Sequence, residues 1–86
     1  MRVKEITLPK NKSVDELIEL IKLANTFESD IHFKSDRFTI DAKSLMGVIT
    51  LIRAGVEMTL MTRGTDEEEA LREISGLLLQ KNNLVK

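Results

Sequence analysis

The residues best suited to chemistry in this 86-residue chain are its single histidine and the serines that precede two apolar segments. His32 follows Asp30 by two positions in a stretch of alternating apolar and polar residues, so both side chains point to the same side of a predicted strand. Together they could supply two ligands to a zinc ion, but a zinc site needs three or four. His32 is therefore interpreted as a residue of a strand surface, and neither a metal site nor a cofactor is predicted.

Ser13 and Ser44 each stand where a helix is expected to begin. Glu16 follows Ser13 by three positions, the spacing at which the two side chains bind each other's backbone N–H groups in a capping box. Ser44 opens an apolar segment and, taken alone, is typical of a helix cap. The acidic run at residues 66–69 is interpreted as the first turn of a helix. Since the chain has no glycine-rich phosphate loop and no serine, histidine and acid set, no enzyme activity is predicted.

The elements that position these residues follow from the spacing of apolar side chains. Alternation predicts strands at residues 2–8, 31–34, 37–40 and 56–61, with a turn at residues 35–36 between the second and third. Spacings of three and four predict helices at residues 13–24, 45–52 and 65–80, the last capped by Thr65 with Glu68 after a turn at residues 62–64. This order predicts an α+β sandwich, with three helices on one face of a four-stranded, mostly antiparallel sheet.

Composition narrows the class of protein. With 86 residues and 42% hydrophobic content, one domain spanning residues 1–86 is expected, ending in a frayed tail at residues 81–86. The 13 basic and 14 acidic residues are mixed along the chain, which argues against nucleic acid as a partner. The chain has no cysteine, no signal peptide and no apolar run near the roughly 20 residues of a membrane span. A cytoplasmic protein is predicted.

Four segments resemble the HPr phosphocarrier family of the bacterial phosphotransferase system, in the same order and at nearly the same separations. They lie at residues 27–31, 41–48, 55–60 and 64–71. The segment at 41–48, Asp-Ala-Lys-Ser-Leu-Met-Gly-Val, resembles the surroundings of the family's regulatory serine. The resemblance implies an HPr-like open-faced β-sandwich, which is the architecture that the periodicity predicts independently.

The family's phosphoryl acceptor is absent from the matching position. HPr proteins receive a phosphoryl group from enzyme I on a histidine within the motif Gly-x-His-Ala-Arg-Pro-Ala, at the start of the first helix. Counting back from Phe27 places Ser13 at the histidine, Asp15 at the arginine and Glu16 at the proline. Asp15 would repel a phosphoryl group, and a serine ester is too stable to hand the group on readily. The resemblance therefore implies that histidine phosphocarrier activity has been lost.

A regulatory role is implied for Ser44. In many HPr proteins of low-GC Gram-positive bacteria the matching serine is phosphorylated by HPr kinase, and the modified protein binds the repressor CcpA. This chain is similar to the catabolite repression HPr-like proteins, a subgroup that has lost the histidine and kept this serine. The resemblance implies phosphorylation of Ser44 beside Lys43, with HPr kinase and a CcpA-type repressor as partners. The added charge is expected to change partner binding and to leave the fold intact.

A partner-binding surface is expected at residues 13–19 and 44–53, together with the neighbouring Lys43. In the family, side chains matching Leu45, Met46 and Ile49 dock onto partner proteins, although periodicity alone would also allow these apolar residues to form a core stripe. On the first helix the acidic side chains, which are Asp15, Glu16 and Glu19, would favour a basic partner and repel an acidic one.

The sequence thus favours an HPr-like, non-catalytic regulatory protein controlled at Ser44 in carbon catabolite regulation. Two alternatives stay open. One is a phosphotransferase system component that uses an atypical phosphoryl acceptor. The other is an unmodified structural module that forms a homodimer through its second helix.

Overall fold

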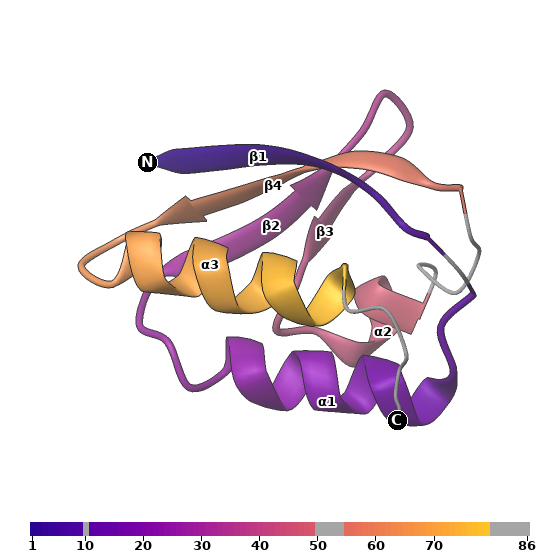
Figure 1. Ribbon diagram of the computed structural model, residues 1–86. Coiled ribbons are helices and arrows are strands. Elements are labelled where there is room, and N and C mark those ends of the chain that lie inside the picture. The colour runs from indigo at the N-terminus through magenta and orange to yellow at the C-terminus, as the bar shows by residue number, and fades with distance from the viewer. Residues whose placement is uncertain (10, 50–54, 80–86) are drawn as a thin grey trace.

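The computed structural model describes residues 1–9, 11–49 and 55–79. Within them the elements follow in the order β1, α1, β2, β3, α2, β4, α3 (Figure 1). The strands are β1 (Arg2–Thr7), β2 (Asp30–Lys34), β3 (Thr39–Asp41) and β4 (Glu57–Arg63). The helices are α1 (Val14–Ala24), α2 (Leu45–Val48) and α3 (Glu67–Leu78). The predicted order of strands and helices is confirmed.

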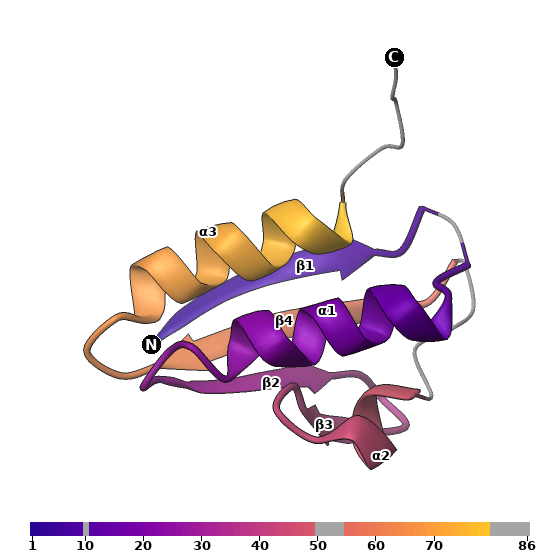
Figure 2. The same ribbon diagram turned by 90° about the horizontal axis from the view of Figure 1, so that it is seen from below.

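The strands form one sheet with the order β1-β4-β2-β3, in which every neighbouring pair is antiparallel. In the middle of the sheet Leu60 of β4 lies opposite Lys4 of β1 on one side and Phe33 of β2 on the other. Figures 1 and 2 show that the three helices lie on the same face of this sheet. The predicted open-faced α+β sandwich is therefore confirmed.

The hydrophobic core lies between the sheet and the helices, because the inward-facing positions of both layers are apolar. Along β4, for example, Met58 and Leu60 are buried, whereas Glu57 and Arg63 are exposed on the other face. Full burial of one such aliphatic side chain contributes about 1.5–3 kcal/mol. The strands contribute Ile6, Ile31, Phe33, Ile40, Met58 and Leu60, and the helices contribute Leu17, Leu20, Ala24, Val48, Ala70, Ile74 and Leu78.

Two local predictions around the β4–α3 connection are wrong. Thr62 and Arg63 belong to β4 and not to a turn. Thr62 is buried, and its hydroxyl donates a hydrogen bond to the carbonyl oxygen of Glu67 at 2.8 Å, which supports the longer strand. The N-cap residue of α3 is Asp66 and not Thr65, and no side chain caps this helix. The predicted end of the second helix at residues 50–52 and the predicted frayed tail lie outside the described residues.

Candidate functional site

Ser13 closes the start of α1 in the predicted capping box. Its hydroxyl oxygen accepts a hydrogen bond from the Glu16 backbone N–H at 3.1 Å, and the Glu16 carboxylate accepts one from the Ser13 N–H at 2.9 Å. Both backbone groups would otherwise lack a partner within the helix. The side chain at the position of the family's histidine is therefore engaged as a helix cap.

Replacing Ser13 by alanine is expected to lower the free energy of unfolding by about 1 kcal/mol, because the Glu16 N–H loses its acceptor. Urea unfolding followed by circular dichroism measures the change. Ser13→Asp, whose carboxylate can accept the same bond, should remain within a few tenths of a kcal/mol of the parent. A Ser13→Ala variant as stable as the parent would show that the cap contributes nothing.

The acidic side chains of α1 and the single histidine lie on different faces of the molecule. Asp15, Glu16 and Glu19 are exposed on α1. His32 is half-buried in β2 and points away from the helices, between the β4 residue Met61 and the β3 residue Asp41 of its cross-strand row. Within residues 1–9, 11–49 and 55–79, no group of three or more histidine, cysteine, aspartate or glutamate side chains is placed to hold a metal ion.

Ser44 is exposed at the end of the turn that leads from β3 into α2. It is the N-cap residue, with φ −109° and ψ 120°, but its side chain makes no capping hydrogen bond. Its backbone is fixed on both sides, since its N–H donates to the Asp41 carbonyl and its carbonyl accepts from Val48, each at 3.0 Å. The hydroxyl is thus presented on an ordered backbone without a capping role.

Lys43 ties the segment that carries Ser44 to the C-terminal end of α1. Its ammonium group donates a hydrogen bond to the carbonyl oxygen of Phe27 at 2.8 Å, and its backbone N–H donates to the Asp41 carboxylate at 2.8 Å. The side-chain amide of Asn25 donates to the Lys43 carbonyl oxygen at 3.4 Å. Phe27 lies in the α1–β2 connection, beyond the C-cap residue Asn25. The ammonium group expected beside Ser44 is therefore engaged at this connection.

The short helix α2 presents most of its apolar side chains to solvent. Leu45, Met46 and Ile49, the last at the C-cap, are 48%, 85% and 40% exposed, whereas Val48 is fully buried. The two views in Figures 1 and 2 place α2 beside α1. Exposed apolar side chains such as these form a surface of the kind that binds other proteins. Glu16 and Glu19 lie elsewhere, since they line a small pocket together with Leu77 and Leu78 of α3.

A carboxylate clasp next to α3 was missed by sequence reasoning. The Asp66 carboxylate accepts hydrogen bonds from the Glu28 N–H and the Ser29 N–H, each at 3.0 Å, and from the Ser29 hydroxyl. These bonds, led by that of the Ser29 hydroxyl, hold the pKa of Asp66 below its ordinary value. The clasp joins the α1–β2 connection to the β4–α3 connection. The partners lie 37 and 38 positions away, so no local pattern could have predicted it.

The sequence of this chain is similar to those of known proteins of one family. Residues 9–80 match the model of the family described as PTS HPr component phosphorylation site. The HPr-like protein Crh of Bacillus subtilis (strain 168) is 36% identical over 62 residues, which cover 71% of this chain and 73% of Crh. No helix among the described residues has the length and apolar character of a membrane span.

Solved structures resemble the whole fold. The phosphocarrier protein HPr of Bacillus anthracis str. Ames superposes with a TM-score of 0.81 at 30% identity, over 90% of this chain and 95% of HPr. Crystalline Crh of Bacillus subtilis, described as a swapped, intertwined dimer, gives a TM-score of 0.70 at 28% identity, over 94% and 97% of the two chains. Because the family match spans residues 9–80, the chain belongs to the HPr family of the phosphotransferase system.

Proposed function

We propose that this chain is a cytoplasmic regulatory member of the HPr family that has lost histidine phosphocarrier activity and is controlled by phosphorylation of Ser44. The modified protein acts in carbon catabolite regulation, with HPr kinase as the modifying enzyme and a CcpA-type repressor as the partner. The exposed Ser44 hydroxyl, which makes no capping hydrogen bond, is the observation that carries the proposal.

Loss of the carrier reaction is supported by the residues at the start of α1. Ser13 replaces the family's histidine, and its oxygen accepts the Glu16 N–H. Asp15 replaces the arginine and is exposed together with Glu19. A phosphoryl dianion would meet negative charge at this end of α1, so transfer from an acidic phosphodonor protein is disfavoured.

Phosphorylation of Ser44 would act on partner binding. A phosphoserine carries a charge of about −1.5 to −2 at neutral pH. It would stand next to the exposed side chains of Leu45 and Met46, so it changes the surface of α2 and leaves the core untouched. Because the Lys43 ammonium group is held by the Phe27 carbonyl oxygen, the phosphate charge stays available to cations of the partner.

Intact-mass spectrometry after incubation with ATP and HPr kinase tests the proposal. The parent protein is expected to gain one phosphoryl group, and Ser44→Ala none. Ser13→Ala is the matched control, since it removes the other serine at a helix start and leaves Ser44 in place; it should be modified like the parent.

A parallel sample with phosphoenolpyruvate and enzyme I separates the rival functions. No phosphoryl transfer is expected in this sample. Transfer from enzyme I would show that the chain is a phosphocarrier with an atypical acceptor. Modification by ATP that persists in Ser44→Ala would show that the modified residue is not Ser44. No modification in any sample would favour an unmodified binding module.

A further inference from the structure

The face of the sheet opposite the helices carries no covering layer among the described residues (Figure 2). Side chains point outward from it in rows that the strand register defines. Read from β1 to β3, one row is Val3, Met61, His32 and Asp41, and the next is Glu5, Thr59, Lys34 and Thr39. In both rows the β4 residue lies between the β1 residue and the β2 residue, so β4 is the middle one of these three neighbouring strands.

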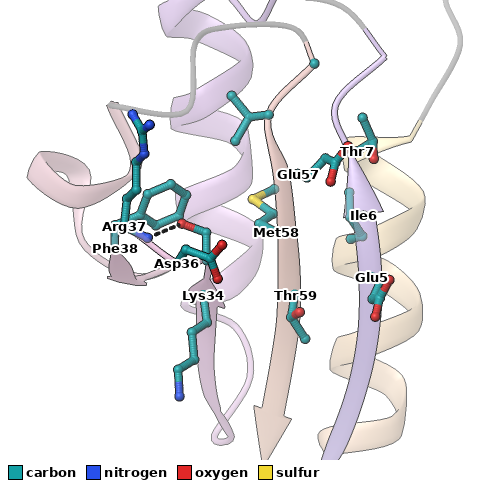
Figure 3. A pocket seen from close by; sticks show the side chains of 13 residues that line it. Glu5, Ile6, Thr7, Lys34, Asp36, Arg37, Phe38, Glu57, Met58 and Thr59 are labelled. Carbon is teal, nitrogen blue, oxygen red and sulfur yellow. Dashed lines mark hydrogen bonds between the residues drawn. The ribbon is translucent and has the colours of Figure 1, made fainter.

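An open hollow of about 900 Å³ lies over the second of these rows and the adjoining β2–β3 turn. Figure 3 shows Glu5 and Glu57 on the side of β1 and β4, and Lys34 and Arg37 on the side of the β2–β3 hairpin. The hairpin side also carries the Asp36 carboxylate. Among the described residues these side chains form no ion pair with one another, so the two walls present separated and opposite charges.

We propose that a second copy of this chain packs against this open face, around a two-fold axis that runs along β4. Such an axis places β1 of each copy over β2 of the other. The wall of the hollow on the side of β1 and β4 then faces the hairpin wall of the partner's hollow. Glu5 then faces the partner's Lys34, and Lys34 faces the partner's Glu5. On the hairpin, Arg37 extends toward the partner's Glu57. The charge pattern of the face is therefore complementary to itself.

The side chains at the axis suit a close approach. Thr59 and Met61 are half-buried residues on β4, and each would meet its own copy across the axis. Threonine is small, and the flexible methionine side chain adapts to irregular contacts. Val3, which is 57% exposed in the same row as Met61, would be covered by the partner's His32. Face-to-face sheets stand about 10 Å apart, a distance that side chains of this size can span.

Like charges at the ends of the axis do not oppose the contact. Glu57 and Arg63 lie at the two ends of β4 and would face their own copies. Each has an opposite charge close by in the dimer, since Asp30 lies beside Arg63 in the strand register and the partner's Arg37 extends toward Glu57. The uncharged residues Thr59 and Met61 form the centre of the contact.

The size of the face predicts a weak dimer. The three strands that overlap, β1, β4 and β2, lie about 4.8 Å apart and are some five residues long, so they cover on the order of 200–250 Å² per copy, less than the roughly 800 Å² of a standard interface. Association should therefore depend on concentration. The helices stay uncovered, so this dimer is compatible with partner binding at α1 and α2 and does not depend on phosphorylation of Ser44.

Sedimentation velocity over a range of protein concentrations tests the proposal. The two-fold axis makes each charge reversal act twice, so Lys34→Glu and Glu5→Lys should each weaken self-association about tenfold. The double variant, with the charges exchanged, should return to within about threefold of the parent. Both residues are exposed, so the fold should persist, which far-ultraviolet circular dichroism checks.

Glu19→Lys is the matched control, because it reverses an equally exposed carboxylate on the helical face. It should leave self-association unchanged. A protein that remains monomeric up to about 1 mM overturns the proposal, since even a weak face-to-face dimer forms at that concentration. The proposal is also overturned if the charge reversals at Lys34 and Glu5 leave the affinity of self-association unchanged. The dimer must then form through another surface or by strand exchange.

Discussion

Gly64→Ala is expected to lower the free energy of unfolding by about 2–4 kcal/mol. Gly64 has φ +150°, a conformation that residues with a Cβ rarely adopt. A Cβ placed there would lie 2.7 Å from the Cα and 2.6 Å from the Oγ of Ser29. Ser29 cannot simply withdraw, because Asp66 accepts hydrogen bonds from its N–H and hydroxyl. Urea unfolding followed by circular dichroism is the suitable measurement, since the chain has no tryptophan or tyrosine for fluorescence.

Two other glycines serve as controls for the same substitution. Gly55 has φ +80°, but a Cβ there meets no atom within 4 Å, so Gly55→Ala should cost only about 1 kcal/mol of backbone strain. Gly76 lies inside α3 with equally open surroundings, and Gly76→Ala should stabilise the protein by about 0.5–1 kcal/mol. If Gly64→Ala were no worse than Gly55→Ala, the close approach to Ser29 would be refuted.

The parts of the fold that sequence reasoning predicted correctly depend on short-range signals. Alternating apolar residues located the strands, and the Ser13–Glu16 spacing predicted a capping box that the structure shows with both hydrogen bonds. These patterns repeat within two to four residues, so they are visible without any knowledge of tertiary contacts.

The errors lie where a distant partner decides the local structure. Thr65 with Glu68 has the spacing of a capping box, yet Asp66 occupies the N-cap position and directs its carboxylate to Ser29. Thr62 has the composition of a turn residue but is held in β4, where it is buried. Both outcomes depend on contacts across the molecule, which no spacing rule contains.

Some features of the candidate site were likewise predictable from local sequence patterns, and others were not. The sequence left open whether the apolar residues of the second helix form a core stripe or a surface, and both occur, since Val48 is buried while Leu45 and Met46 are exposed. The position of Ser44 at the start of α2 followed from the sequence. The contact of the Lys43 ammonium group with the Phe27 carbonyl oxygen did not, because it depends on how the segment before α2 packs against the α1–β2 connection.

Asp66→Asn is expected to lower the melting temperature at pH 7 by about 5–10 °C. The Asp66 carboxylate accepts three hydrogen bonds, from the Glu28 N–H, the Ser29 N–H and the Ser29 hydroxyl. An asparagine keeps one acceptor oxygen and turns an NH₂ donor toward the remaining donors, so at least one of them loses its partner. Thermal unfolding followed by circular dichroism measures the difference, and Asp36→Asn on the exposed β2–β3 turn should melt like the parent.

The same clasp makes the stability of the protein depend on pH. The pKa of Asp66 is lower in the folded chain than in the unfolded chain, so its ionised form stabilises the fold above the unfolded pKa, near 4, and this contribution is lost as the pH falls through the lower, folded pKa. The melting temperatures of the parent and Asp66→Asn should therefore converge below about pH 4. Glu67, whose pKa is also lowered, chiefly by the Gly64 N–H, titrates in both proteins and cancels in the comparison. A difference that stayed constant down to pH 2 would mean that the ionised Asp66 carboxylate is not what holds the clasp.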